Sequence, residues 1–288
     1  PGQSITKTSR IFAGAKRVNV LERYEHEDKI PSFTDAVDWS WLFFITKPFF
    51  WLLKIFQGWF GSFGLAILAL TVVVKTVFFP LQFGMYKSMS KMRLLQPEMK
   101  SIQDRFAADP QRMRQEQAKL WQREKINPLA GCLPIIPTMF VFYALFHTLA
   151  VTIEMRHTPF FGWIRDMSAP DPTTVFNLFG LIPWNPGTVP LIGGLLMIGV
   201  WPLLYGGTMV LLQGLSTPPA DKMQRAIMRW IPLIFLVLFA GFASGLVIYY
   251  VWSNIISVIQ QYIIMRRTGV ETEFDKFIAK RFGKKTPA

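Results

Sequence analysis

The sequence predicts an all-α integral membrane protein with a core of five transmembrane helices. Of its 288 residues, 51% are hydrophobic, 15% are aromatic and only 17% are charged, which is too apolar for an ordinary soluble domain. The apolar residues form long runs without Asp, Glu, Lys or Arg. The 31 basic residues, set against 18 acidic ones, lie mainly between those runs, where positive charge orients membrane helices and attracts anionic lipid. A disordered chain is therefore excluded.

The polar N-terminal region covers residues 1–36 and is expected to contain a strand around residues 10–21. It shows no signal peptide, because no short apolar core with a small-residue cleavage site follows a basic stub. The chain begins with Pro1, so we expect a fragment of a longer protein. Residues 37–59 combine Trp and Phe with Lys47 and Lys54. Aromatic rings with spaced lysines suit the headgroup layer, which predicts an interfacial amphipathic helix.

The first crossing is expected at residues 60–84. Twenty uncharged residues precede Lys75, and about 20 apolar residues make one helical span. Residues 85–128 are strongly charged and are expected to form a helical hairpin outside the bilayer. Its first arm has an apolar stripe with steps of three or four residues, and Asp109 with Pro110 marks the turn.

Uncharged runs define the remaining crossings. Residues 126–153 are uncharged for 28 positions, residues 172–220 for 49 with prolines interrupting them, and residues 230–265 for 36. The last run is read as two crossings with a turn at Ala243–Gly245, because this places both flanking basic segments on one side. The expected segments after the hairpin are a helix at 129–154, an outer loop at 155–189, a helix at 190–213, an inner loop at 214–222, helices at 223–242 and 245–265, and a basic inner tail at 266–288.

Lys75 is the first candidate for a functional residue, because an ammonium near the middle of a bilayer costs about 2.5–3.5 kcal/mol and usually faces a bundle interior or a wet cavity. The alternative is that its long stem reaches the headgroups. Thr71 lies one turn earlier on the same face. The other intramembrane hydroxyls and amides are individually best explained as interhelical hydrogen bonds. Exposed apolar side chains such as Met139 and Phe142 also suit a surface that accepts varied apolar sequences.

No catalytic, cofactor-binding or metal-binding group is predicted. The three histidines lack partners at ligand spacing, the single Cys132 cannot form an internal disulfide, and no phosphate loop or nucleophile elbow is present. Two classes of function remain as alternatives at this point. A small-solute transporter or channel would show repeats and matching broken helices, and a Ser/Lys hydrolase would place a serine in hydrogen-bond contact with Lys75.

Several long segments resemble the YidC/Oxa family of membrane protein insertases in its Gram-negative form. They are LAILALTVVVKTVFFPLQFGMYKSMSKMRLLQPEMK, KINPLAGCLPIIPTMFVFYALF, EMRHTPFFGWIRDMSAPDP and SGLVIYYVWSNIISVIQQYIIMRR, which begin at residues 65, 125, 154 and 244. The segment SRIFAGAKRVNVLERYEHE, from Ser9, is similar to the end of that family's periplasmic domain. The resemblance implies that residues 1–36 are the remnant of this domain and that an upstream helix is missing.

The resemblance also implies a function and a site. It implies an insertase and chaperone, not an enzyme, whose five helices surround a hydrophilic groove open to the cytoplasm and to lipid. Lys75 matches the basic groove residue, which is arginine in many members. Thr71 and Tyr250 match groove and core positions, and Met139 and Phe142 match positions that contact substrate.

The partners implied are nascent membrane proteins, the ribosome through the basic tail and cytoplasmic loops, the Sec translocon and membrane lipids. No specific nucleic acid sequence and no cofactor is expected. The implied location is the bacterial inner membrane, with a cytoplasmic C-terminus.

Overall fold

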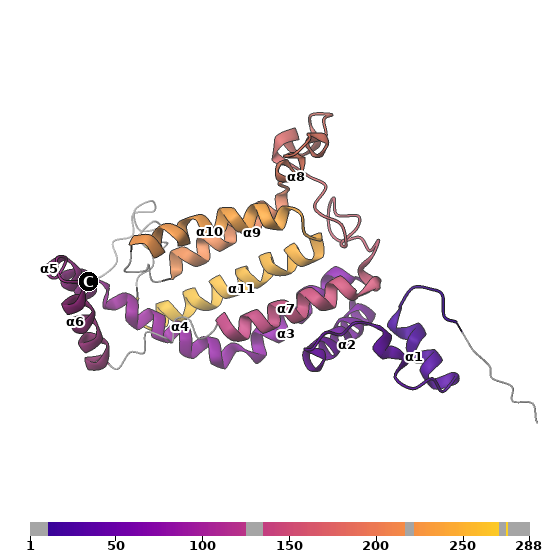
Figure 1. Ribbon diagram of the computed structural model, residues 1–288, viewed down its shortest axis with the longest axis horizontal. Helices are drawn as coiled ribbons and strands as arrows, with labels where there is room; N and C mark the ends of the chain where they lie inside the picture. The colour runs from indigo at the N-terminus through magenta and orange to yellow at the C-terminus, as the bar shows by residue number, and fades with distance from the viewer. Residues whose placement is uncertain (1–10, 125–134, 217–221, 271–274, 276–288) are drawn as a thin grey trace, which may run out of the picture.

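The described residues fold into a bundle of helices with smaller helical elements at both ends, as the ribbon shows (Figure 1). The computed structural model describes residues 11–124, 135–216, 222–270 and 275. No strand is present in these ranges. The all-α class predicted from composition and apolar runs is therefore correct.

The N-terminal part is helical where a strand was expected. Residues 11–17 have no regular structure, and α1 covers Val18–Glu27. The strand prediction at residues 10–21 was wrong because the apolar residues of this segment pack on one helical face. Val18 and Leu21, three positions apart, are both buried against Val37 and Phe50. Spacing of three residues suits one face of a helix and not one face of a strand.

The amphipathic segment forms α2, which covers Phe43–Phe60. Its buried side contains Phe49, Leu53 and Phe56, whereas other aromatic rings of the helix stay exposed. The helix ends at Gly61, which has φ of 66° and donates its N–H to Gln57 O at 2.8 Å. A left-handed residue after the last turn favours glycine because it has no Cβ.

The helix expected at residues 60–84 is divided into two. α3 covers Phe63–Val77, α4 covers Phe79–Leu94, and the two are bent by 66°. Pro80 explains the break, since proline has no N–H to donate to the carbonyl four residues earlier and its ring crowds that carbonyl, so the hydrogen bonding of α3 cannot continue. Beyond the bend, α4 leads from the bundle to the charged segment that follows it.

The charged segment forms α5, covering Gln96–Arg105, and α6, covering Pro110–Arg123. Asp109 caps α6 by accepting hydrogen bonds from the N–H groups of Gln111 and Arg112 at 3.1 and 3.0 Å, as expected of an N-cap before proline. Arg123 and Glu98 form an ion pair of 2.7 Å between the two helices. The first arm of the expected hairpin therefore breaks at Leu95, before Pro97, instead of running unbroken to Phe106.

The remaining helices build the bundle. α7 covers Ile135–Val151, α9 covers Val200–Leu215, α10 covers Lys222–Ala240 and α11 covers Ser244–Arg267. The expected helix at 190–213 contains a break, because the four-residue α8 (Gly193–Leu196) is separated from α9. The short 3-10 helices are η1 (Phe33–Ala36), η3 (Ile153–Met155), η4 (Val175–Gly180) and η5 (Pro186–Thr188).

Length and composition identify fewer complete spans than five. Among the described residues, Met223–Ala240 and Ser244–Arg267 are long and apolar enough to cross a membrane, and the bent pair α3 and α4 could make a third. Thr138–Val151 and Val200–Leu215 are shorter apolar helices. Cys132, residues 217–221 of the 214–222 loop, and residues 271–274 and 276–288 of the basic tail lie outside the described residues.

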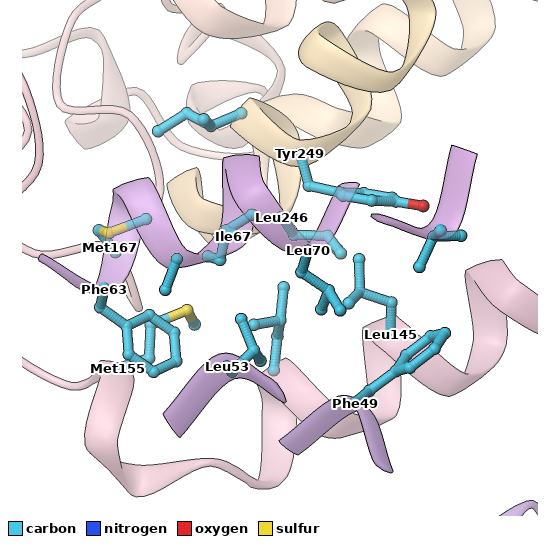
Figure 2. Packing of buried hydrophobic residues seen from close by; sticks show 14 of the residues in the cluster. Phe49, Leu53, Phe63, Ile67, Leu70, Leu145, Met155, Met167, Leu246 and Tyr249 are labelled. Carbon is cyan, nitrogen blue, oxygen red and sulfur yellow. The ribbon is translucent and has the colours of Figure 1, made fainter. Parts of the chain in front are cut away.

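The main core lies where α2, α3, α7 and α11 meet (Figure 2). Leu53, Ile67, Leu70 and Leu145 are almost fully buried there. Lipid chains are as apolar as leucine, so in a membrane this core is stabilised mainly by close packing and less by transfer out of water.

The segment expected to form the outer loop, residues 155–189, is hydrogen-bonded to the start of α11. The backbone N–H groups of Ser244 and Gly245 donate to Ala169 O and Met167 O at 2.8 and 2.9 Å. These bonds satisfy N–H groups that a helix N-terminus leaves without intrahelical partners. The loop therefore fixes the end of α11 that lies opposite α5 and α6.

Candidate functional site

The Lys75 side chain points into the bundle. It lies in the last turn of α3, and its Nζ donates a hydrogen bond to Ser257 Oγ of α11 at 2.6 Å. Ser257 is also hydrogen-bonded to the side chain of Tyr86 in α4. The ammonium therefore contacts a buried hydroxyl of another helix. The headgroup alternative required it to extend beyond the end of its own helix instead.

A small cavity of about 40 Å³ adjoins Lys75. A water molecule needs about 10–15 Å³ of such space and several polar partners, so the cavity has room for two or three. The side chain of Gln82 lines it, and its Oε1 is buried without a hydrogen-bond partner in the structure. The residues that line the cavity are Val74, Lys75, Phe78, Leu81, Gln82, Thr138, Val141, Tyr249 and Ser253.

The charge of Lys75 has no carboxylate partner among the residues that the structure describes. The ion pairs found there involve other residues, at positions 22–54, 98–124, 147–166 and 266–275. Electrostatic attraction is stronger at low dielectric than in water. An uncompensated cation at this place can therefore attract an acidic or polar group supplied by another molecule.

The other predicted site residues are not gathered around this cavity. Thr71 is buried and donates to Ile67 O of its own helix at 2.7 Å. Met139, on α7, is 59% exposed and lies beside Thr138, which lines the cavity. Lys75 is thus the one of the five predicted residues that lines the cavity itself.

Tyr250 and Phe142 contact each other away from the cavity lining. Their ring centroids are 5.0 Å apart, and Tyr250 also contacts Tyr205 and Phe239 at 6.1 and 5.2 Å. The Tyr250 hydroxyl is buried without a hydrogen-bond partner in the structure. Its neighbour Tyr249, and not Tyr250, lines the cavity. Tyr250 therefore belongs to an aromatic cluster that packs α7, α9, α10 and α11 together.

Four other polar side chains of the bundle helices form hydrogen bonds to a different element. Gln261 donates to Leu215 O at 3.0 Å, Asn254 to Thr208 Oγ1 at 3.2 Å, Gln213 to Met228 O at 3.0 Å and Ser244 to Ala169 O at 2.7 Å. The first three bonds join two helices, as expected, whereas Ser244 bonds to a loop residue and not to another helix.

Sequence reasoning missed Ser257, Tyr86 and Gln82. A signal for Ser257 was present, because Tyr249, Ser253 and Ser257 recur every four residues and share one face of α11. Tyr86 and Gln82 could not be found in this way. Both belong to α4, and after the bend that follows α3, Gln82 lines the cavity with Lys75 and Tyr86 reaches Ser257.

The described residues contain no group of three or more His, Cys, Asp or Glu side chains placed to hold a metal ion. The nearest approach to a catalytic arrangement is the contact between Lys75 and Ser257. The hydrolase alternative required a serine in contact with Lys75, and Ser257 meets this requirement.

Family comparisons agree with the resemblance seen in the motifs. The family model described as "60Kd inner membrane protein" matches residues 55–271, and the model of the YidC periplasmic domain matches residues 1–52. The relative named "Membrane protein insertase YidC" from Maricaulis maris is 54% identical over 97% of this chain and 47% of its own length. The protein of the same name from Caulobacter vibrioides is 50% identical over 99% of this chain and 49% of its own length.

The chain spans about half the length of these curated relatives. The solved structure described as an active YidC insertase with the first transmembrane domain resolved has a TM-score of 0.56 to this chain and 21% identity, with 86% of this chain and 53% of that chain covered. This likeness shows a shared fold. Because the family model matches most of the sequence, the chain belongs to the 60Kd inner membrane protein family, the YidC/Oxa family of the bacterial inner membrane.

Proposed function

We propose that the chain is the membrane-embedded half of an insertase and chaperone for nascent membrane proteins. The relatives that share about half of its residues are named as membrane protein insertases. The observation that carries the proposal is the Lys75 ammonium, which contacts Ser257 beside a small cavity and has no carboxylate partner in the part of the chain described. An acidic or polar client segment can supply the counter-charge.

In this proposal the polar outer segment of a client enters the bundle beside Lys75, while its apolar segment slides along α7 into lipid. Burial of about 0.8 kcal/mol per methylene drives the apolar segment and offsets transfer of a short polar tail. The exposed rings and side chains of Met139, Phe140 and Phe146 offer an apolar surface on α7. Thr71, Tyr250 and Phe142 support this region through packing.

The cavity of about 40 Å³ is large enough for water molecules but too small for a peptide. The proposal therefore includes a widening of the space between α3, α7 and α11 when a client enters. In the same proposal, α5 and α6 with the basic tail face the cytoplasm and meet the ribosome, α1 and α2 face the periplasm, and the Sec translocon receives or supplies longer clients.

The test is insertion of single-span clients into proteoliposomes that contain the parent chain, Lys75→Arg or Lys75→Glu. We expect the arginine variant to insert a client with an acidic N-terminal tail nearly as well as the parent, and the glutamate variant to lose at least tenfold. A client with a neutral tail is the matched control, and its insertion by the glutamate variant should fall much less. Equal insertion of the acidic-tail client by the glutamate variant would contradict the proposal.

A Ser/Lys hydrolase is the second candidate, because Lys75 and Ser257 are in hydrogen-bond contact. Its geometry is poor. Ser257 is buried in the interior of α11, where the backbone N–H groups already bond within the helix and cannot stabilise an oxyanion. A fluorophosphonate probe separates the two candidates: adduct formation on Ser257, lost in Ser257→Ala together with insertion, would favour the hydrolase.

A small-solute transporter predicts saturable flux of ions or metabolites through the same proteoliposomes. The insertase predicts client insertion without such flux. Measuring both in one preparation distinguishes the two functions.

A further inference from the structure

A second, larger cavity lies between α1 and α2. Its volume is about 330 Å³, within the range typical of small-molecule sites. Figure 1 shows both helices at the end of the bundle opposite α5 and α6. The residues that line the cavity are Val18, Glu22, Glu25, His26, Thr34, Trp39, Lys47, Phe50, Trp51 and Lys54.

The two helices present opposite charges to this cavity. Lys47, Trp51 and Lys54 are spaced four and three residues apart on α2, so they share one helical face. Glu22, Glu25 and His26 share the facing side of α1. Lys54 Nζ is 3.4 Å from Glu22 Oε2, which shows how close the two charged rows come.

A backbone hydrogen bond favours the ionised form of the Glu25 carboxylate. Its Oε2 accepts a hydrogen bond from the Thr34 N–H at 3.0 Å, and this bond holds the pKa of Glu25 below its ordinary value. On the basic side, Lys47 lies 2.9 Å from Asp35 and 5.8 Å from the centre of the Trp39 ring. The cavity therefore combines fixed negative charge, positive charge and an aromatic ring.

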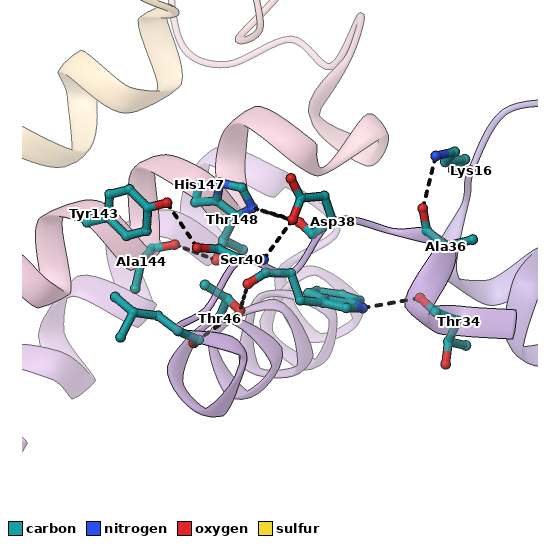
Figure 3. Close-up of polar contacts among 12 residues, drawn as sticks. Lys16, Thr34, Ala36, Asp38, Ser40, Thr46, Tyr143, Ala144, His147 and Thr148 are labelled. Carbon is teal, nitrogen blue, oxygen red and sulfur yellow. Dashed lines mark hydrogen bonds and ion pairs between the residues drawn. The ribbon is translucent and has the colours of Figure 1, made fainter. Parts of the chain in front are cut away.

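The apolar floor of the cavity consists of buried and packed side chains. Val18 and Phe50 are buried, and the Trp39 ring packs against Phe50 with centroids 5.5 Å apart. The Trp39 indole N–H donates to Thr34 O at 3.2 Å, a contact drawn in Figure 3. In the same view, contacts of Asp38 and Ser40 with His147 and Tyr143 attach this region to α7.

The cavity opens where lipid headgroups are expected. Trp51 lines the cavity and is 62% exposed, and Phe43, Phe44 and Trp59 are exposed along the same helix. Tryptophan rings concentrate at the membrane interface because they combine an apolar body with a polar N–H. A ligand that carries charge and remains attached to acyl chains can reach the cavity from the bilayer.

We propose that this cavity binds the phosphoethanolamine headgroup of a phospholipid. Its phosphate pairs with Lys54 and Lys47, and its primary ammonium donates to Glu25 and lies near the Trp39 ring. Charge-assisted hydrogen bonds need an N–H donor, which a choline headgroup lacks. A purely anionic headgroup meets Glu22 and Glu25 unfavourably. The proposal goes beyond insertion and does not depend on Lys75.

The test is lipid retention by the purified full chain, measured by native mass spectrometry after exchange into equal amounts of phosphatidylethanolamine, phosphatidylcholine and phosphatidylglycerol. We expect one phosphatidylethanolamine to be retained at least fivefold over the other two. The double variant Glu25→Gln, Lys54→Gln should lose this preference. Glu27→Gln, Lys29→Gln is the matched control, because it removes the same charges at two exposed positions, the last residue of α1 and a residue just after it, that do not line the cavity. This variant should keep the preference.

Location is tested with a photoreactive phosphatidylethanolamine, whose adducts we expect within residues 18–54 of the parent chain and not of the double variant. Soluble glycerophosphoethanolamine should not displace the lipid at submillimolar concentration. Displacement would contradict the proposal that the bound headgroup belongs to a membrane lipid. Equal retention of the three lipids, as expected if a peptide segment occupies the cavity, would overturn the proposal. Thermal unfolding of each variant shows whether α1 and α2 stay folded. Lys54→Arg is the conservative variant and should keep lipid binding.

Discussion

Lys75 Nζ and Ser257 Oγ are 2.6 Å apart although 182 residues separate them in the chain. This hydrogen bond joins the last turn of α3 to the middle of α11, next to the cavity and the bend into α4. Hydrogen bonds that involve a charged group contribute about 1.5–3 kcal/mol. The contact thus stabilises the packing of α3 on α11, and in the proposed function a client group has to compete with Ser257 for the lysine.

Replacing Ser257 with alanine tests the structural effect. We expect the free energy of unfolding in detergent to fall by about 1–3 kcal/mol, because the ammonium loses its protein acceptor and only cavity water can replace it. Insertion of acidic-tail clients should persist, since the charge remains. Thr76→Ala is a control on the adjacent exposed position, where the hydroxyl bonds only Val72 O, and should change stability by less than about 0.5 kcal/mol.

Asp171 should be essential for the connection between the outer loop and α9. Its buried carboxylate accepts from Trp163 Nε1 at 3.0 Å, Thr173 N at 3.0 Å and Trp201 N at 2.9 Å. Asp171→Ala leaves these donors without an acceptor, and we expect a loss of about 3 kcal/mol or more. Thermal unfolding measures it, with exposed Asp104→Ala as the control. A shift no larger than that control would contradict the assignment.

Gly64 should not tolerate a side chain. A Cβ at this position would lie 1.9 Å from Phe160 Cδ2, and overpacking of this kind costs about 1–3 kcal/mol or more. Gly64→Ala should therefore lower the unfolding temperature, and the added change Phe160→Ala should recover part of the loss. Gly58→Ala is the matched control, because nothing lies within 4 Å of its Cβ, and it should be neutral or stabilising. Additive effects of the two changes at 64 and 160 would argue against the contact.

Acid should weaken the outer loop through Asp166. Hydrogen bonds from the Ser168 side chain, from the Ser168 N–H and from the His157 N–H hold the pKa of Asp166 below its ordinary value of 3.8. The folded state favours the ionised form, so the stabilisation is complete above the ordinary value and is lost as pH falls through the lower folded value. The difference in unfolding temperature between the parent and Asp166→Asn should be present at neutral pH and disappear as pH falls below the folded pKa. A difference independent of pH would contradict this.

Several features of the fold could be predicted from the sequence. Apolar runs between charged segments predicted an all-helical membrane protein, and Asp109 with Pro110 predicted the start of α6, because these signals are local. The strand expected near residues 10–21 failed because the packing of Val18 and Leu21 on Val37 and Phe50 was decided by distant residues. The helix expected at 60–84 is broken after Val77 because Pro80 cannot donate the hydrogen bond that would continue α3 into α4.

The candidate site was predicted only in part. Lys75 could be identified from one charge in an apolar run, since the cost of burying it is large wherever the helix lies. That its partner is Ser257, that Tyr249 and not Tyr250 lines the cavity, and that Gln82 lies beside it could not be known before the helices were assembled.

The sequence by itself determined the helical class, the membrane location and the position of the intramembrane cation, because hydropathy and charge act residue by residue. Only the tertiary structure decided which side chains surround Lys75 and that α1 and α2 enclose a mixed-charge cavity. The physical reason is that these contacts depend on the bend after α3 and on the rotation and packing of helices far apart in the chain. Local spacing does not fix those quantities.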